Sequence, residues 1–209
     1  MAEMKFKELT EKEVQQIDKL QSEYFTKYMH LFDPPLPDGV PERLEKIVLS
    51  AGISGSDRVL DIGTGTGILI PIILKYEPAL VYANDLSKKM LESVKARYPD
   101  VRTLHGDIRD LKLPQSSIDV VFVNACYPNI ADKHRSFVNI RRMTRSGCRI
   151  VISHPMGSSF IGLLQEKVPF SLDDFPEDET VAMSLFAPYG FKVSDLVKED
   201  NLYILVLEG

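Results

Sequence analysis

Cysteine is scarce in this chain, which has Cys126 and Cys148 among its 209 residues. Two isolated cysteines provide neither a disulfide framework nor a cysteine-rich zinc site, so no metal site is expected. Both lie in or beside apolar runs, which favours two reduced, partly buried thiols. A cytoplasmic protein is the natural expectation.

Long apolar stretches are also missing. No run approaches the roughly 18 residues that a membrane-spanning helix needs. The opening residues, Met1 to Lys5, carry no apolar signal core. We therefore expect an intracellular protein without a membrane partner.

A surplus of basic residues is absent as well. The chain has 25 Lys and Arg against 30 Asp and Glu, a net charge of −5. Proteins that bind nucleic acid through its phosphates are usually basic, so no nucleic-acid partner is expected. The other proportions, 44% hydrophobic and 26% charged residues, are ordinary for a globular protein of one domain, or one domain with a small cap.

The first forty residues predict a helical cap. Thr10 and Glu13 have the spacing of a capping box, and apolar residues then recur on one face as far as Phe32. The proline-rich stretch 33–39 ends this helix. We therefore divide the chain into an N-terminal helical cap, 1–40, and a main domain, 41–209.

The main domain alternates strands and helices. Strands are expected at 59–62, 80–83, 101–104, 118–123 and 149–153, and helices at 44–51, 68–76, from 87, and at 132–144. Continuous apolar strands separated by helices indicate an α/β fold, a parallel sheet covered on both faces. Two β-rich runs, 191–197 and 202–207, predict a terminal hairpin, so one strand runs antiparallel.

A glycine-rich turn is the most informative segment. Gly63, Gly65 and Gly67 follow the first expected strand and lead into a helix. Such glycines let the backbone approach a ligand. A dinucleotide fingerprint would need glycine where Ile68 stands. Asp61, at the strand end, would repel a pyrophosphate and suits an ammonium or sulfonium group instead.

This spacing resembles motif I of the class I S-adenosylmethionine-dependent methyltransferases, Asp/Glu-x-Gly-x-Gly-x-Gly, and in particular their small-molecule, methyltransferase-11-like members. The resemblance covers roughly residues 42–209. It implies a Rossmann-like sheet of seven strands in the order 3-2-1-4-5-7-6, with the last strand antiparallel, and S-adenosyl-L-methionine as cofactor.

The resemblance also implies roles for residues at the strand ends. Asp85 would accept hydrogen bonds from the ribose hydroxyls and Asp107 from the adenine amino group, while Leu86 packs on the ring. The full set of expected cofactor-binding residues is Asp61, Gly63, Thr64, Gly65, Gly67, Asp85, Leu86, Asp107, Ile108 and Asn124. Alternatives stay open, because the glycines could serve chain geometry, Asp85 could cap a helix, and Asp107 and Asn124 suit turns.

Methyl transfer from a sulfonium is an in-line displacement of an activated donor, so the protein supplies mainly position and a dry site. Ligands of such sheets lie beyond the carboxyl ends of the strands. His154 is therefore a candidate catalytic residue with a pKa suited to a base near neutrality, or a residue that bonds a loop. Tyr127 is a second candidate, to orient substrate or simply to pack.

Three other segments carry expectations. Tyr24 or Tyr28 is expected near the methionine end of the cofactor. An insertion at about 157–180 is either a lid over the acceptor or a surface helix with an acidic loop. The basic stretch from Lys133 to Arg149 favours a solvated face over a nucleic-acid site. Cys126 lacks the partners of a thiolate set.

The leading hypothesis is a methyltransferase acting on a small-molecule substrate, as a monomer or homodimer. One alternative is a non-catalytic cofactor-binding or partner-regulating protein on the same fold. A nucleotide-dependent oxidoreductase is less favoured because of Asp61 and Ile68, and a protein substrate stays open. The acceptor atom is not readable from these residues.

Overall fold

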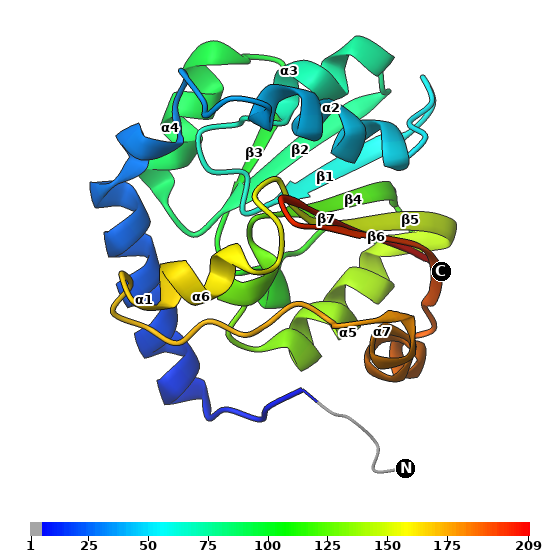
Figure 1. The fold of residues 1–209 in the computed structure, drawn as a ribbon. Helices are drawn as coiled ribbons and strands as arrows, with labels where there is room; N and C mark the ends of the chain where they lie inside the picture. The colour runs from blue at the N-terminus through cyan, green and yellow to red at the C-terminus, as the bar shows by residue number, and fades with distance from the viewer. Residues whose placement is uncertain (1–5) are drawn as a thin grey trace.

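The fold is built on one seven-stranded sheet, described for residues 6–209 in a computed structural model (Figure 1). The prediction about Met1 to Lys5 lies outside these residues. The strand order is β3-β2-β1-β4-β5-β7-β6, as the resemblance implied. The strands are β1 (Arg58–Ile62), β2 (Leu80–Asp85), β3 (Arg102–His105), β4 (Ile118–Asn124), β5 (Thr144–His154), β6 (Lys192–Glu199) and β7 (Leu202–Glu208).

The predicted terminal hairpin is confirmed. β7 lies between β5 and β6 and pairs antiparallel with both, whereas β1 to β5 pair in parallel. Six of the seven residues of β7 are buried. The strand that is last in sequence is therefore an inner strand of the sheet.

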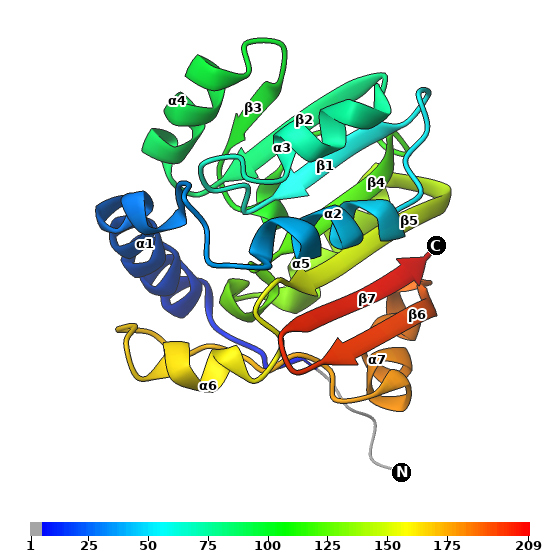
Figure 2. The ribbon, with the colours of Figure 1, turned by 45° about the horizontal axis from the view of Figure 1, so that its top comes forward.

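Helices cover both faces of the sheet (Figure 2). One face packs against α2 (Val40–Ser50), α3 (Ile70–Ile73) and α4 (Lys88–Arg97). The other packs against α5 (Lys133–Met143), α6 (Phe160–Gln165) and α7 (Glu179–Phe186). Each face buries its own apolar cluster, because successive residues of a strand point to opposite sides. No helix within residues 6–209 is both long and apolar enough to cross a membrane.

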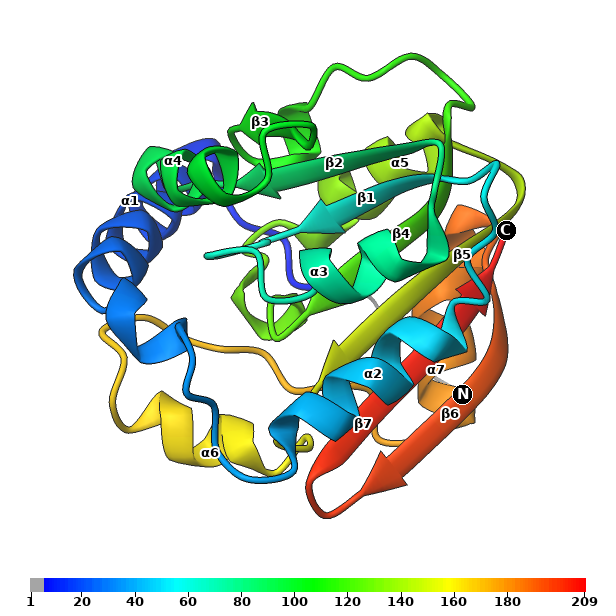
Figure 3. The ribbon, with the colours of Figure 1, turned by 90° about the horizontal axis from the view of Figure 1, so that it is seen from above.

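The N-terminal helix α1 (Glu11–Lys27) begins with the predicted capping box between Thr10 and Glu13. It ends five residues before Phe32, and a 3-10 turn at Met29–Phe32 completes the segment. Asp33 is extended, as a residue before proline must be. Seen from above, α1 lies beside the edge at which β1 to β4 end, and α6 lies on the same side of the sheet as α1 (Figure 3). The division at residue 40 stays a prediction.

Two predicted elements have different lengths in the structure. The helix expected at 68–76 is one α-helical turn, α3, followed by a 3-10 turn at Leu74–Tyr76. Strand β5 begins at Thr144 rather than 149 and includes Gly147, whose φ is 76°. Residues 145–147 near its start are polar or glycine and are exposed, so no apolar run in the sequence marked this part of the strand.

Candidate cofactor and acceptor site

The predicted polar residues meet at one edge of the sheet because the parallel strands end together. Ile62 pairs with Asn84, Asp85 with His105, and Asn124 with Ser153. This register aligns the carboxyl ends of β1 to β5, where ligands of open α/β sheets bind.

The three glycines of the turn after β1 have different surroundings. All have positive φ, 64° at Gly63, 55° at Gly65 and 87° at Gly67. A Cβ atom at Gly63 would collide with Cys126 Sγ, and one at Gly67 would lie 2.8 Å from Ile70 Cδ1. A Cβ at Gly65 would meet nothing within 4 Å. Gly63 and Gly67 therefore allow close packing, and Gly65 leaves open space for a ligand.

The Asp85 carboxylate holds the turn in place. One oxygen accepts from the Gly65 amide at 2.9 Å and the other from the Ser87 amide at 2.8 Å. Burial raises the pKa of Asp85, while these two hydrogen bonds oppose the rise. The side chain that caps α4 is Ser87, which accepts from the Met90 amide, so Asp85 does not serve as that cap. Its role at a ribose stays a prediction.

Asp61 is a buried acid without a cation. It is 2% exposed and accepts a hydrogen bond from the Thr64 hydroxyl at 2.7 Å. Burial raises its pKa to about 7, and the neighbouring charge of Asp85 adds to the rise. Within residues 6–209, no basic side chain forms an ion pair with Asp61 or Asp85. A ligand with a positive group fits this pair of carboxylates.

Asp107, predicted to bind adenine, already has protein partners. It accepts from the Arg109 amide at 2.8 Å, and its other oxygen lies 3.5 Å from Arg109 Nε. The charge of Asp107 in turn helps to raise the pKa of Asp18 on α1, after burial. Its neighbour Ile108 is 4% exposed and belongs to the apolar cluster under α5. Contact of these two residues with an adenine ring stays a prediction.

The ends of β2 and β4 show two further features. The carbonyl of Leu86 accepts from Ser22 Oγ at 3.2 Å, so α1 contacts the expected cofactor loop. Asn124 Oδ1 accepts from Ser153 Oγ at 3.0 Å. The next residue, Ala125, has a φ of 51°, a strained conformation for a residue with a side chain. Such strain is concentrated at binding sites.

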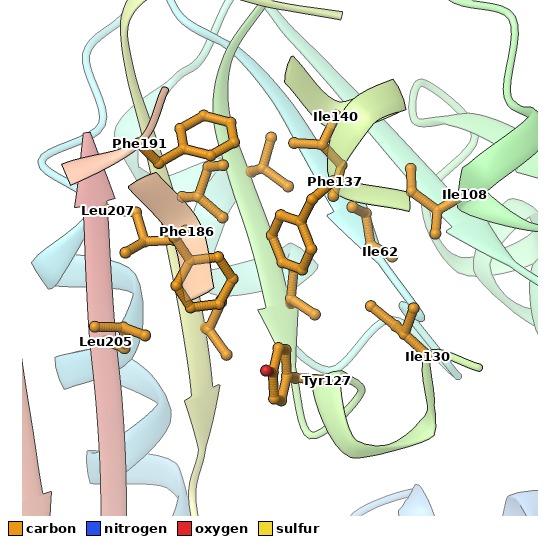
Figure 4. Packing of buried hydrophobic residues seen from close by; sticks show 14 of the residues in the cluster. Ile62, Ile108, Tyr127, Ile130, Phe137, Ile140, Phe186, Phe191, Leu205 and Leu207 are labelled. Atoms are coloured by element: carbon orange, nitrogen blue, oxygen red, sulfur yellow. The ribbon is translucent and has the colours of Figure 1, made fainter. Parts of the chain in front are cut away.

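Tyr127 lies in the apolar core, where it is 2% exposed. Figure 4 shows it in one cluster with Phe137 and Phe186, and its ring stacks on Phe175 with centroids 5.6 Å apart. Lys133 Nζ lies 4.9 Å from the ring centre. Burial raises the pKa of Tyr127. This environment matches the packing interpretation, and orientation of substrate stays a prediction.

The structure corrects the pKa expected for His154. The side chain is 4% exposed and packs against Phe160 and Phe175. Burial lowers its pKa to about 4. The Met156 amide donates to Nδ1 at 3.1 Å, so the neutral ring carries its hydrogen on Nε2. His154 therefore suits donation of a hydrogen bond better than acceptance of a proton near neutrality.

The insertion after β5 is anchored rather than loose. The Asp173 amide donates to the Pro128 carbonyl at 3.1 Å, and Lys133 Nζ donates to the Asp173 carboxylate at 2.5 Å. The Phe175 ring lies 4.5 Å from that of Tyr203. On α1, Tyr24 packs 4.7 Å from Tyr28 and 5.7 Å from Phe170. The lid function, and approach of these tyrosines to a cofactor, stay predictions.

The basic stretch is solvated only in part, because Arg135, Arg142 and Arg145 are exposed and the others are not. Lys133 is 3% exposed, with a pKa lowered by burial. Arg142 donates to the carbonyls of Leu111 and Leu113, and Arg149 pairs with Asp57 at 2.7 Å. Further partners are Glu11, Asp110 and Asp132 for Arg135, and Asp119 for Arg145. These charges serve the fold itself.

Sequence reasoning missed Arg43 and Arg109. Arg43 donates through Nε to the Pro155 carbonyl at 2.6 Å, 112 positions away. Arg109 is nearly enclosed and pairs with four acids, Glu11, Asp18, Asp107 and Asp110. No local motif marks either residue, because their partners come from distant parts of the chain.

Comparison with known proteins identifies the architecture. The family model of the methyltransferase domain matches residues 60–152. The demethylmenaquinone methyltransferase of Thermotoga maritima is 32% identical over 97 residues, which are 46% of this chain and 42% of that protein. The chain spans about half the length of the curated relatives it matches.

Solved structures share the fold. A methyltransferase from Haloferax volcanii in complex with the Trm112 methyltransferase activator superposes with a TM-score of 0.77 at 16% identity, over 90% of this chain and 96% of that one. A SAM-dependent methyltransferase from Aquifex aeolicus gives 0.67 at 18% identity, over 87% and 96%. At these identities the likeness establishes the arrangement of the elements.

Proposed function

We propose that this chain, which belongs to the class I S-adenosylmethionine-dependent methyltransferases, transfers a methyl group to a small-molecule acceptor. The cofactor of this family is S-adenosyl-L-methionine. When bound, it supplies a methyl group on a sulfonium, ready for in-line displacement. The protein's own contribution is to bind, to orient and to exclude water.

The observation that carries the proposal is the unpaired acid pair at the end of β1 and β2. Asp61 is buried, its pKa is raised to about 7, and Asp85 adds negative charge beside it. Burying a carboxylate without a cation is unfavourable, so the arrangement is costly for the empty protein. A cationic cofactor would remove that penalty.

Each of the other residues would contact a different part of the cofactor. Gly65 would let the backbone approach, since its surroundings are open. Asp85 would keep the turn in place and accept from the ribose, and Asp107 with Leu86 would hold the adenine. His154, through Nε2, would give a hydrogen bond to the acceptor rather than remove its proton.

A small acceptor is supported by what covers this edge. α1 contacts the loop after β2 through Ser22 and Leu86. The segment 170–176 is fixed to the loop after β4 through Asp173 and Pro128. An acceptor must reach the site between these two segments, which favours a small molecule over a folded protein. The net charge of −5 disfavours nucleic acid.

Calorimetry with S-adenosylhomocysteine tests the proposal directly. The wild-type protein should bind it, and Asp85→Ala should weaken binding at least about tenfold, because the turn loses its two amide contacts. Glu92→Ala, which removes an exposed acid from α4, is the matched control. No binding at about millimolar ligand would refute the proposal.

The pH dependence of binding tests the role of Asp61. A cation favours the ionised acid, so affinity for S-adenosylmethionine should rise with pH below about 7, by up to about tenfold per unit. Asp61→Asn should bind more weakly near neutrality and lose this dependence. A wild-type affinity that stays flat between about pH 5.5 and 7.5 would remove Asp61 from the site.

A partner-dependent enzyme is the second candidate. The Haloferax volcanii protein with the same fold is bound to an activator. If this chain also needs a partner, the purified protein should bind S-adenosylhomocysteine weakly and aggregate when concentrated. Tight binding of S-adenosylhomocysteine by the isolated chain, without aggregation, would exclude this candidate.

A further inference from the structure

Arg43 lies beside the loop that follows β5. It belongs to the first turns of α2 and is half-buried. Its Nε donates to the Pro155 carbonyl at 2.6 Å, and Nη2 lies 3.8 Å from Met156 Sδ. Pro155 and Met156 directly follow His154 at the carboxyl end of β5. The guanidinium is therefore fixed at the edge where ligands of this fold bind.

The charge of Arg43 is not balanced by an acid. Within residues 6–209 no carboxylate forms an ion pair with it, whereas Arg97 and Arg149 each have one and Arg109 has four. Its Nη1 makes no hydrogen bond to the described residues. An arginine that is held on one edge by a carbonyl and has no acid partner can still bind an anion.

Gly39 makes room for this arginine. Its φ is 74°, and a Cβ atom there would lie 2.8 Å from Arg43 Nη1. A residue with a Cβ atom there would require the Nη1 group of Arg43 to shift. Turn geometry and arginine position are thus matched at the start of α2.

We infer that Arg43 is a specificity-determining residue that binds an anionic group, a carboxylate or a phosphate, on the acceptor. This inference rests on the proposed function. The carboxylates of Asp61 and Asp85 would repel an anionic acceptor, so a fixed cation on the acceptor side is required to hold one. The planar guanidinium binds both carboxylate and phosphate oxygens well.

The test uses the whole protein and matched pairs of probes. We would titrate 3-phenylpropionate against 3-phenylpropionamide, and phenyl phosphate against phenol, with and without S-adenosylhomocysteine, by calorimetry. The wild-type protein should prefer at least one anion over its neutral partner by about tenfold or more. The pair that shows the preference distinguishes a carboxylate from a phosphate.

Three variants test whether the preference for the anionic probe depends on Arg43. Arg43→Gln should abolish it, and Arg43→Lys should keep part of it, because charge remains without the planar fork. Lys46→Gln removes an exposed charge from the same helix and should leave the preference intact. If Arg43 only fastened α2 to the loop, Arg43→Gln would weaken anions and neutral partners alike. If Arg43→Gln does not fold, the ratio of anion affinity to neutral-probe affinity is measured in Arg43→Lys instead. A ratio below that of the wild-type protein supports the inference, and an unchanged ratio contradicts it.

Two outcomes overturn the inference, a wild-type protein with no preference for either anion up to about 10 mM, or a preference that survives in Arg43→Gln. Failure of S-adenosylhomocysteine to bind would instead refute the proposed function, and the titrations without it would still report on Arg43.

Discussion

Two segments beside the carboxyl edge of the sheet, helix α1 and residues 170–176, differ in how they are attached to the main domain. Helix α1 buries two residues, Val14 and Gln21, and is held by hydrogen bonds and ion pairs. The segment 170–176 buries Phe170 and Phe175. The contacts of α1 are mainly polar, with Tyr24 and Phe25 against Phe170, whereas 170–176 adds the buried Phe175 ring to the polar contacts of Asp173.

The polar attachment of α1 runs along its length. Arg109 joins Glu11 and Asp18 to the main domain, Gln21 donates to the Asn129 carbonyl at 2.8 Å, and Thr26 hydrogen-bonds Ser87 at 2.6 Å. Water can replace each of these contacts when the helix separates, so separation is inexpensive. Exposing the Phe175 ring, which packs on Tyr127 and Tyr203 of the main domain, is not. The comparison predicts that α1 separates from the main domain more readily than the segment 170–176 does.

Replacing Phe175 should give the largest effect. Phe175→Ala removes a ring that stacks on Tyr127 and packs against Tyr203, and should lower the free energy of unfolding by about 3–5 kcal/mol. Denaturant unfolding measures it. Leu163→Ala, exposed on α6, is the control and should change stability by less than about 0.5 kcal/mol. Equal losses of stability in Phe175→Ala and Leu163→Ala would contradict the role of the Phe175 ring in attaching this segment.

Replacing Arg109 should detach α1 without unfolding the sheet. Arg109→Met leaves Asp18 and Asp107 facing each other without a cation, and should lower stability by about 1–3 kcal/mol. Hydrogen exchange should speed up in α1 and stay unchanged in 170–176. Arg102→Met, on the exposed edge strand β3, is the control. Unchanged protection in α1 would show that its attachment does not depend on this cluster.

The smallest effect should come from the proton on Asp18. Burial, and then the Asp107 charge, raise the pKa of Asp18 from 3.8 to about 7 in the docked helix. Docked Asp18 therefore holds a proton that the undocked chain releases, so docking weakens as pH rises from about 4 to about 7 and stays weaker above. Because Asp18 keeps contact with water, we expect no more than about 1 kcal/mol.

Asp18→Asn should remove this dependence. Protection factors of α1 amides, corrected for intrinsic exchange, would be compared at about pH 5 and about pH 7.5. The wild-type protein should show lower protection at the higher pH, and the variant should not. A wild-type profile that rises with pH would contradict the assignment, because the sign would be reversed.

The sequence predicted those parts of the site that lie close together along the chain. Asp61 and the turn from Gly63 to Gly67 form one continuous segment, so spacing alone identified it. The strand cores were equally readable from their apolar runs, and α1 from its capping box. Their ends were not, because Thr144 pairs with Ile118 through backbone groups, ahead of an irregular stretch that no side-chain pattern reveals.

The remaining features depend on distant partners. The pKa of His154 is lowered by burial among rings from α6 and the segment after it, which no pattern near residue 154 reports. Lys133 is buried beside Asp173, which lies 40 positions away in the sequence and accepts a hydrogen bond from its ammonium group. Arg43 and Arg109 acquire their roles in the same way. Local spacing identifies motifs, and tertiary packing determines what each charge does.

The position of β7 has a consequence for the order of folding during synthesis. β5 leaves the ribosome about fifty residues before its partner β7, and β6, which comes between them in the chain, does not pair with β5. One edge of β5 and the apolar surface beneath it therefore stay uncovered until residues 202–208 have emerged. Uncovered strand edges and apolar surface promote aggregation, so pairing of β7 with β5 removes such a surface from the folding chain.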